Sequence, residues 1–566
     1  MAIPDVDMVE KPDPKRVRRT VSGVALVVVA AVAYRASLGI SFVDDAHYAS
    51  IVLYLSQGAR PFVDDMTSQV LGFLAAVPFA KAWTALFGLN GFVLALRLFY
   101  VAVSAGVATA VYRLIRPSFG TVPSALGAAV VFLVPPFNIL GVSYNTMAMS
   151  GLVLGSALCL ASIRDQSPRL AIGAGAAIAF AAISYPPLVI GAIVLAVTYA
   201  AVARSWRLVL SALGGAAAVL VVFGVWLLAT VHMSDIQLSL KYANAVWEGY
   251  RSPADKITVM LRFTRRALLT RWTLPAWGLG FIAGLPVLDR RVRAAAAALV
   301  PVACLVPAIR VLISGNTLVQ FGTNGAAYMI LFAVTAAFPV VATALAGRDT
   351  DALRGLALTA PLAVLGYLVV AYSSSSGYLN AVPVIAVAPL ATFVVVGWSR
   401  LVGHGRIAQG ASSALLIGVL VSLLFATSFS ESPPLGLRSR FTSGALAGIA
   451  TTPERKADIE RIADAGKRWS EPSDDVLVVG RPLGYLLVPG RAHTNAVWLA
   501  TGASDQYTVD YFARTGAPDV VYINRSVLSS AGGLDAAAAK DPLVAFLAEE
   551  YALVETFDPF AVFVRR

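Results

Sequence analysis

Apolar segments of about 20 residues recur along most of this 566-residue chain, and this recurrence limits the fold more than any single motif does. The hydrocarbon core of a bilayer is about 30 Å thick, so a helix needs about 20 mainly apolar residues to cross it. Only 13% of the residues are charged, whereas a soluble globular domain carries about 25%. The pattern therefore predicts a polytopic α-helical membrane protein and excludes a soluble enzyme, a disordered chain or a disulfide-rich secreted protein.

We predict 13 membrane spans from these segments. They lie near 20–38, 91–112, 120–141, 146–163, 170–184, 187–203, 208–231, 271–288, 294–313, 323–346, 355–372, 381–398 and 410–428. One more apolar run, 69–88, is long enough either to cross the bilayer or to lie along its surface.

The positions of lysine and arginine decide between these two placements of 69–88. If the N-terminal tail is cytoplasmic and 69–88 does not cross, six short turns with at least two arginines each all fall on the cytoplasmic side. The opposite short turns at 142–145, 185–186, 314–322 and 373–380 contain no lysine or arginine. A crossing at 69–88 would invert every later turn and break the positive-inside rule. We therefore predict a multi-pass protein of the cell membrane with a cytoplasmic N-terminus and a juxtamembrane 69–88.

This topology divides the chain into three parts. Residues 1–19 form a cytoplasmic tail, 20–428 form the transmembrane domain with a long first outer loop at 42–90, and 429–566 form an extracytoplasmic domain. The net charge of +12 lies mostly in short loops between apolar runs, which is typical of membrane flanks. We therefore expect the lipid bilayer, and no nucleic acid, as a partner.

The last part of the chain changes composition. Strand-like runs at 475–480 and 519–523 alternate with polar helical stretches at 453–469 and 504–515, and 551–564 resembles two strands around a turn. Such alternation predicts a small α/β domain. Two roles for this domain stay open. It either gates a substrate or binds the acceptor, or it acts as a passive cap.

Two acidic pairs, Asp44-Asp45 and Asp64-Asp65, lie in the first outer loop. Adjacent carboxylates at a membrane boundary are costly if they face lipid. Each pair could simply cap the helix that follows it. Alternatively, two pairs in one loop indicate a polar site, in which a carboxylate acts as a general base or holds a divalent cation.

The order of features at the N-terminal end resembles one known family. A basic tail and one span are followed by Asp44-Asp45, an amphipathic helix, the stretch 58–62, an apolar helix ending at Gly88, and Arg97. This order is similar to the first module of the GT-C integral-membrane glycosyltransferases, and most of all to their protein O-mannosyltransferase and lipid A aminoarabinose transferase branch. The resemblance covers 1–165 at the level of motifs and the rest at the level of topology.

The resemblance implies a GT-C-like fold, a polyprenyl-phosphate sugar as donor, and a glycan or protein as acceptor. The first acid of the pair is the catalytic base in that family, which implies that Asp44 deprotonates the acceptor and that Asp45 positions it or binds metal. A divalent metal ion is the one cofactor suggested. The chain departs from its relatives later in the loop, where Asp64, Asp65 and Gln69 stand in place of a lysine or a proline-rich anchor.

Candidate substrate-binding residues lie in the outer loops. The basic outer loop 232–270 offers cations that suit a phosphate group, although a patch for lipid headgroups explains it equally well. Neutral polar groups in other turns suit sugar hydroxyls, and His47 lies about one helical turn after Asp44. The predicted substrate-binding residues are His47, Asp64, Asp65, Gln69, Asn145, Lys241, Arg251, Arg262 and Tyr378.

These features predict a membrane glycosyltransferase that moves a sugar from a polyprenyl-phosphate donor to an acceptor hydroxyl on the outer face of the cytoplasmic membrane. Its product would be a cell-envelope glycan or a glycoprotein. The alternative is a transporter, flippase or export component for lipid-linked or polymeric glycans. Transport favours ionisable residues at mid-span and broken helices in two halves, whereas the acids here cluster at the outer boundary.

Overall fold

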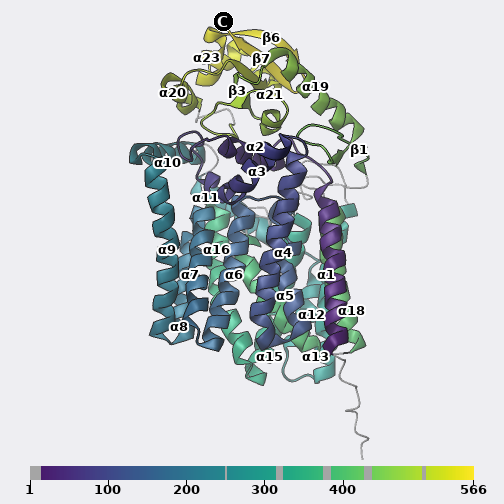
Figure 1. The fold of residues 1–566 in the computed structure, drawn as a ribbon. Helices are drawn as coiled ribbons and strands as arrows, with labels where there is room; N and C mark the ends of the chain where they lie inside the picture. The colour runs from purple at the N-terminus through teal and green to yellow at the C-terminus, as the bar shows by residue number, and fades with distance from the viewer. Residues whose placement is uncertain are drawn as a thin grey trace, which may run out of the picture.

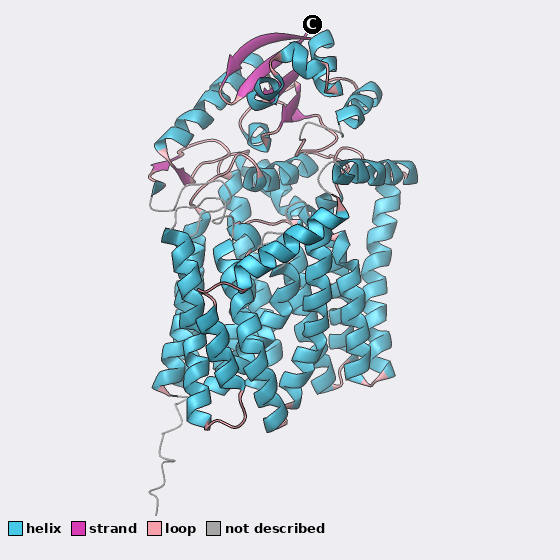
Figure 2. Cartoon of the chain, turned by 180° about the vertical axis from the view of Figure 1, so that it is seen from behind, coloured by secondary structure: helices cyan, strands magenta, loops and turns pink. Residues whose placement is uncertain are grey.

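A computed structural model describes residues 14–248, 252–313, 323–373, 384–403, 405–425, 436–499 and 505–566. Long helices run side by side in a bundle, and a smaller domain sits on one end of it (Figure 1). Figure 2 shows from behind that the strands of the sheet gather in this smaller domain, which consists of 436–499 and 505–566 and is called the C-terminal domain below. The predicted fold class, a polytopic helical protein with a C-terminal α/β domain, is confirmed.

A helix lies at each predicted span. These helices are α1 (Pro14–Ala36), α4 (Phe92–Phe119), α5 (Thr121–Leu133), α6 (Tyr144–Asp165), α7 (Pro168–Ser184), α8 (Val189–Ala203), α9 (Trp206–Thr230), α12 (Leu274–Gly284), α13 (Arg290–Ile313), α15 (Thr323–Gly347), α16 (Thr350–Ser373), α17 (Val384–Val402) and α18 (Arg406–Phe425). Within the described residues, nine helical stretches are long and apolar enough to cross a membrane, and four apolar helices are shorter. The helix positions agree with the predicted spans, and the count of 13 crossings stays a prediction.

The ambiguous run 69–88 is among those nine stretches, but the structure divides it into two helices. The 3-10 helix η1 (Ser68–Ala76) is followed by α3 (Val77–Phe87), which lies with α2 (Asp44–Ser56) at the end of the bundle that carries the C-terminal domain (Figure 1). An α-helix of 11 residues is about 16 Å long, about half the thickness that it would have to cross. The division of the run therefore fits the predicted juxtamembrane placement.

Glycines allow helices of the bundle to pack closely, as Gly175 and Gly72 illustrate. Gly175 of α7 lies against α9, where a side-chain Cβ would come within 1.8 Å of the carbonyl oxygen of Ala212. Gly72 of η1 lies against the start of α6, where a Cβ would be 2.1 Å from the Cα of Tyr144. Small residues let two helix backbones approach closely. Helices in lipid associate through such van der Waals contacts, because no hydrophobic driving force acts between them. The contact at Gly72 also brings the first outer loop onto α6.

The remaining helices outside the C-terminal domain are short or lie across the bundle. They are η2 (Pro136–Asn138), η3 (Pro186–Leu188), α10 (Met233–Glu248) and α11 (Pro253–Leu268). Figure 1 shows α10 lying across the end of the bundle below the C-terminal domain, with the start of α1 at the opposite end. The chain direction then puts the arginine-bearing turns after α4, α6, α8, α15 and α17 at the end away from that domain.

The C-terminal domain contains a five-stranded mixed sheet in the order β4-β3-β5-β7-β6. Its strands are β3 (Asp475–Val479), β4 (Arg491–Ala492), β5 (Val520–Asn524), β6 (Tyr551–Phe557) and β7 (Phe560–Arg565), and β1 (Ser439–Arg440) pairs separately with β2 (Ala450–Thr451). The helices are α19 (Pro453–Trp469), η5 (Pro482–Leu486), α20 (Asp505–Thr515), α21 (Arg525–Ala531), α22 (Leu534–Ala538) and α23 (Pro542–Glu550). The helices and strands predicted from alternation are confirmed, whereas α21–α23 and β4 were not predicted.

The second acidic pair of the first outer loop holds the C-terminal domain. The carboxylate of Asp65 accepts hydrogen bonds from the N–H of Val497 at 3.0 Å and from the N–H and hydroxyl of Thr67 at 2.9 and 2.5 Å. The N–H of Met66 donates to the carbonyl of Asn495 at 2.7 Å. The expected role as a helix cap is wrong for this pair, since Thr67 precedes η1 and no side chain caps it.

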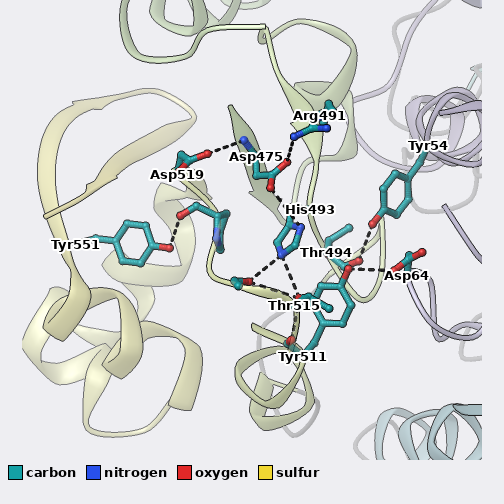
Figure 3. Close-up of polar contacts among 12 residues, drawn as sticks. Tyr54, Asp64, Asp475, Arg491, His493, Thr494, Tyr511, Thr515, Asp519 and Tyr551 are labelled. Atoms are coloured by element: carbon teal, nitrogen blue, oxygen red, sulfur yellow. Dashed lines mark hydrogen bonds and ion pairs between the residues drawn. The ribbon is translucent and has the colours of Figure 1, made fainter. Parts of the chain in front are cut away.

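Asp64 extends the same contact. Its carboxylate accepts hydrogen bonds from the Tyr511 hydroxyl at 3.2 Å and from the N–H of Arg60 at 2.8 Å. The Tyr54 hydroxyl of α2 donates to the carbonyl of Thr494 at 3.0 Å. Figure 3 shows Tyr54 and Asp64 on one side of this contact and Thr494 and Tyr511 on the other. The first outer loop and the C-terminal domain thus share one polar interface.

We expect Asp65→Ala to loosen the C-terminal domain, because the N–H of Val497 would lose its buried acceptor at a cost of about 1–3 kcal/mol. Hydrogen–deuterium exchange of segment 493–499 should become about 5- to 150-fold faster in the detergent-solubilised variant. Glu549→Ala, at an exposed position of α23, is the matched control and should leave this exchange unchanged. Equal exchange in Asp65→Ala and the wild type would contradict the assigned role of Asp65.

Candidate active site

The first acidic pair lies in the first turn of α2. Val43 precedes the helix and no side chain caps it, so the expected capping role of Asp44 or Asp45 is wrong. Negative charge is still favoured in this turn, because the N-terminal end of a helix carries partial positive charge. Successive residues of an α-helix point about 100° apart, so the two neighbouring carboxylates face different surroundings.

Asp45 is buried in an ion pair with Arg97 of α4. Arg97 also donates to the backbone carbonyls of Ala36, the last residue of α1, at 2.8 Å and of Gly39 at 2.7 Å. The N–H of Asp45 donates to the Ser41 hydroxyl at 3.2 Å. Asp45 therefore has a structural partner, and its implied role in positioning an acceptor or binding metal stays a prediction.

Asp44 lies in a different environment from its neighbour. Its Oδ2 atom is shielded from solvent and has no hydrogen-bond partner among the described residues. Burial raises the pKa of Asp44 to about 7, although a hydrogen bond from its own backbone N–H acts in the opposite direction. A carboxyl group that is about half ionised at neutral pH is suited to general-base catalysis.

Two more buried polar side chains near Asp44 have unused hydrogen-bonding atoms. Neither ring nitrogen of His47 has a partner in the described part of the chain, and burial lowers the pKa of His47 to about 3, so the ring is neutral. Asn145 donates to the Tyr48 hydroxyl at 3.5 Å, but its Oδ1 atom has no partner within the same residues. Buried polar atoms are normally paired. Several unpaired atoms in one place therefore indicate a site for a polar ligand or water.

Aromatic rings surround these polar atoms. The ring of His47 lies 6.1 Å from that of Tyr48, and Tyr144 lies 6.5 Å from Tyr48 and 5.3 Å from Tyr185. From the C-terminal domain, the ring of Trp498 lies 5.5 Å from His47. Apolar walls with a few convergent polar groups are typical of small-molecule sites. We call Asp44, His47, Asn145 and these rings the acidic site.

The structure separates the other predicted site residues from the acidic site. Asp64 and Asp65 lie in the contact with the C-terminal domain, and Gln69 is half-buried at the start of η1. Lys241 is exposed on α10 and Arg262 is exposed on α11. Arg251 and Tyr378 lie outside the described residues. Of the predicted residues, Asp44, Asp45, His47 and Asn145 are therefore the ones found together.

Two arginines of the C-terminal domain were not predicted as site residues. The guanidinium carbons of Arg455 and Arg481 lie 5.1 and 5.3 Å from the centre of the Phe42 ring, two residues before Asp44. Burial lowers the pKa of Arg481. No local sequence signal identifies this pair, because the two side chains meet Phe42 only through the packing of the C-terminal domain on the first outer loop.

The described residues offer little to a divalent cation. They contain no group of three or more histidine, cysteine, aspartate or glutamate side chains placed to hold a metal ion. Asp45 is engaged by Arg97, and a cation site usually combines several oxygen ligands. The suggestion that Asp44 and Asp45 bind metal therefore gains no support from the ligands around them.

Comparisons with other proteins add only distant likenesses. No protein-family model matches the chain, and no curated protein matches its sequence. Among solved structures, ArnT from Cupriavidus metallidurans bound to undecaprenyl phosphate is 15% identical, covers 97% of this chain and 98% of its own, and has a TM-score of 0.44. The oligosaccharyltransferase of Archaeoglobus fulgidus in its apo form is 13% identical, with 96% of this chain and 74% of its own covered and a TM-score of 0.48. Since both TM-scores are below 0.5, we draw no inference about activity from either likeness.

We expect Arg97→Met to destabilise the protein by about 3–5 kcal/mol, because it leaves the Asp45 carboxylate buried without its counter-ion. The double variant Asp45→Asn/Arg97→Met should recover much of this loss, since it removes both charges. Thermal unfolding in detergent measures both effects, and Arg262→Met on the exposed face of α11 is the control. An unchanged melting temperature for Arg97→Met would show that the ion pair does not support the fold.

The raised pKa of Asp44 makes stability depend on pH. Folding raises this pKa from 3.8 to about 7, so its contribution to stability is full below about pH 4 and is lost as the pH rises through about 7. We expect Asp44→Asn, which cannot ionise, to melt at a higher temperature than the wild type at pH 8, by a margin that shrinks toward pH 5. Asp510→Asn, at an exposed position of α20, should show no such trend. A margin independent of pH would contradict the assigned pKa.

Proposed function

We propose that this protein is a membrane glycosyltransferase of the GT-C kind. It transfers a sugar from a polyprenyl-phosphate donor to an acceptor hydroxyl on the outer face of the cytoplasmic membrane, in the synthesis of a cell-envelope glycan or a glycoprotein. The observation that carries the proposal is the carboxyl group of Asp44, whose Oδ2 is buried without a partner in the described residues and whose pKa is raised to about 7. The N-terminal motif, with its resemblance to that family, supports it independently.

Asp44 acts as the general base in the proposed reaction. It accepts the proton of the acceptor hydroxyl while the hydroxyl oxygen forms a bond to the anomeric carbon of the donor sugar. The bond from that carbon to the phosphate oxygen breaks, and its electron pair leaves with the polyprenyl phosphate. A base with a pKa near the working pH both takes and releases the proton readily.

His47 and Asn145 are suited to hold the substrate against Asp44. A neutral imidazole has one donor and one acceptor nitrogen, and an amide oxygen accepts hydrogen bonds. Sugar hydroxyls both donate and accept, so they match the atoms of these two side chains that have no partner among the described residues. Binding would then remove the cost of leaving those atoms unpaired.

Cations near Asp44 are suited to the leaving phosphate. Arg455 and Arg481 lie beside Phe42, and a guanidinium group matches two phosphate oxygens with its fork of N–H donors. A bound phosphate would also favour the charged form of Arg481, which burial disfavours. Lys241 and Arg262 are exposed on α10 and α11, where positive charge suits lipid headgroups.

The outer-face location rests on the positive-inside rule. The turns that carry arginine lie at the end of the bundle away from the C-terminal domain and the acidic site (Figure 1). Cytoplasmic turns are the ones enriched in arginine and lysine. The acidic site, the C-terminal domain and the C-terminus then belong to the extracytoplasmic side.

The placement of buried charge favours an enzyme over a transporter. Transport sites commonly use ionisable side chains near the middle of the membrane. In the described part of the chain, the buried charged side chains lie in the C-terminal domain or at the end of the bundle next to it (Figure 1). They are Arg35, Asp45, Asp65, Arg97, Lys256 and Asp505.

Asp44→Asn is expected to lower the transfer rate by about 10²- to 10⁴-fold, which is the usual contribution of a general base. In the wild type, kcat/KM should rise with pH through about 7, because only ionised Asp44 accepts the proton. The measurement uses purified protein in proteoliposomes, a panel of radiolabelled polyprenyl-phosphate sugars, and cell-envelope glycan and peptide acceptors. Asp510→Asn is the control and should match the wild type.

Three outcomes would count against parts of this proposal. Transfer by Asp44→Asn at the wild-type rate would overturn the assignment of the base. Failure of the wild type to consume any lipid-linked sugar would overturn the proposed activity. Movement of intact lipid-linked sugar across the bilayer without transfer would favour the transporter instead.

A further inference from the structure

Trp498 of the C-terminal domain reaches the acidic site. Its ring lies 5.5 Å from that of His47, with an angle of 53° between the two planes. Trp498 is half-buried, whereas His47 is only 1% exposed. Trp498 therefore keeps part of its surface exposed beside a histidine that is enclosed.

The backbone on both sides of Trp498 is held by hydrogen bonds. Before it, the N–H of Val497 donates to Asp65 at 3.0 Å, and the carbonyl of Asn495 accepts from Met66 at 2.7 Å. After it, the carbonyl of Leu499 accepts from the N–H of Gly480, next to the end of β3, at 2.8 Å. These bonds connect the segment to the first outer loop on one side and to the sheet on the other. A backbone that is fixed in advance restricts where the attached indole can lie, so less conformational freedom is lost when it binds a ligand.

The neighbours of Trp498 distinguish it from a residue that only fills the interface. An interface filler would be enclosed and would contact mainly apolar side chains. Trp498 is half-buried, and its ring contacts an imidazole that has no hydrogen-bond partner at either nitrogen among the described residues. A sugar ring has a face of C–H groups and a rim of hydroxyls. The apolar indole face matches the C–H groups, and the unpaired polar atoms beside it match the hydroxyls.

We propose that the C-terminal domain completes the acidic site by supplying Trp498 as the platform for a sugar ring. This inference rests on the proposed function. It assigns the domain a role in substrate binding instead of that of a passive cap. The sugar lies against the indole face and directs hydroxyls toward the nitrogens of His47 and the Oδ1 of Asn145. Tryptophan suits this role, because it offers a large contact area with only two rotatable side-chain bonds. The ring belongs either to the lipid-linked donor or to the glycan acceptor.

Steady-state kinetics of Trp498→Ala and Trp498→Phe separate these two sources of the ring. With the donor sugar that the wild type consumes, Trp498→Ala should raise one KM by about tenfold, with less effect on kcat, whereas Trp498→Phe should raise it by less than about threefold. A raised donor KM assigns the platform to the donor sugar, and a raised acceptor KM assigns it to the acceptor. Tyr511→Phe removes a bond between the domain and Asp64 without touching the acidic site, and should leave both KM values unchanged.

A binding measurement distinguishes contact with sugar from a purely structural effect. Undecaprenyl phosphate without a sugar should bind Trp498→Ala as tightly as the wild type, as followed by intrinsic fluorescence in detergent. The inference is overturned if both KM values stay unchanged in Trp498→Ala, if Tyr511→Phe raises the same KM equally, or if undecaprenyl phosphate binding falls as much as sugar binding. A wild type that transfers no sugar would contradict the proposed function itself, and the role of Trp498 would be withdrawn with it.

Discussion

The buried ion pair between Asp45 and Arg97 is the interaction on which the geometry of the acidic site depends. Arg97 joins three segments, since it binds Asp45 of α2 and the carbonyls of Ala36 and Gly39 at the end of α1, and itself belongs to α4. A buried charge without a partner costs several kcal/mol, about as much as many proteins have in total stability. The orientation of α2 is therefore set by Asp45, and the direction of Asp44 follows from it.

The four acids of the two pairs in the first outer loop have different contacts. Asp65 accepts a hydrogen bond from Val497 and Asp64 accepts one from Tyr511, so this pair links the first outer loop to the C-terminal domain. In the first pair, Asp45 holds Arg97 and Asp44 keeps an oxygen without a partner in the described residues. A group left unsatisfied inside a protein lowers stability, and such groups are common at functional sites. Asp44 therefore differs from the other three acids in the way that a catalytic group would.

Much of the fold could be predicted because membrane spans and short strands have local signatures. The thickness of the bilayer sets a length that a single apolar segment must meet, and helices lie at all the predicted positions, from α1 to α18. The helix α19 and the strands β3 and β5 follow from composition and alternation within a few residues. The strand order β4-β3-β5-β7-β6 could not be predicted, because it depends on pairing between residues far apart in the chain. The short helices α21–α23 were missed as well, since segments of 5 to 9 residues carry little periodic signal.

The sequence by itself determined that the chain is a helical membrane protein with an α/β domain at its C-terminal end, and that acids gather in the first outer loop. It also singled out Asp44, His47 and Asn145, and it proposed Arg251, Arg262 and Tyr378 as further substrate-binding residues. Only the tertiary structure showed that Asp45 is paired with Arg97 whereas Asp44 keeps an oxygen without a partner in the described residues, and only it brought Trp498 to His47. The reason is physical: composition and hydropathy act within one segment, whereas burial, counter-ions and ring contacts arise between segments that meet only when the chain folds.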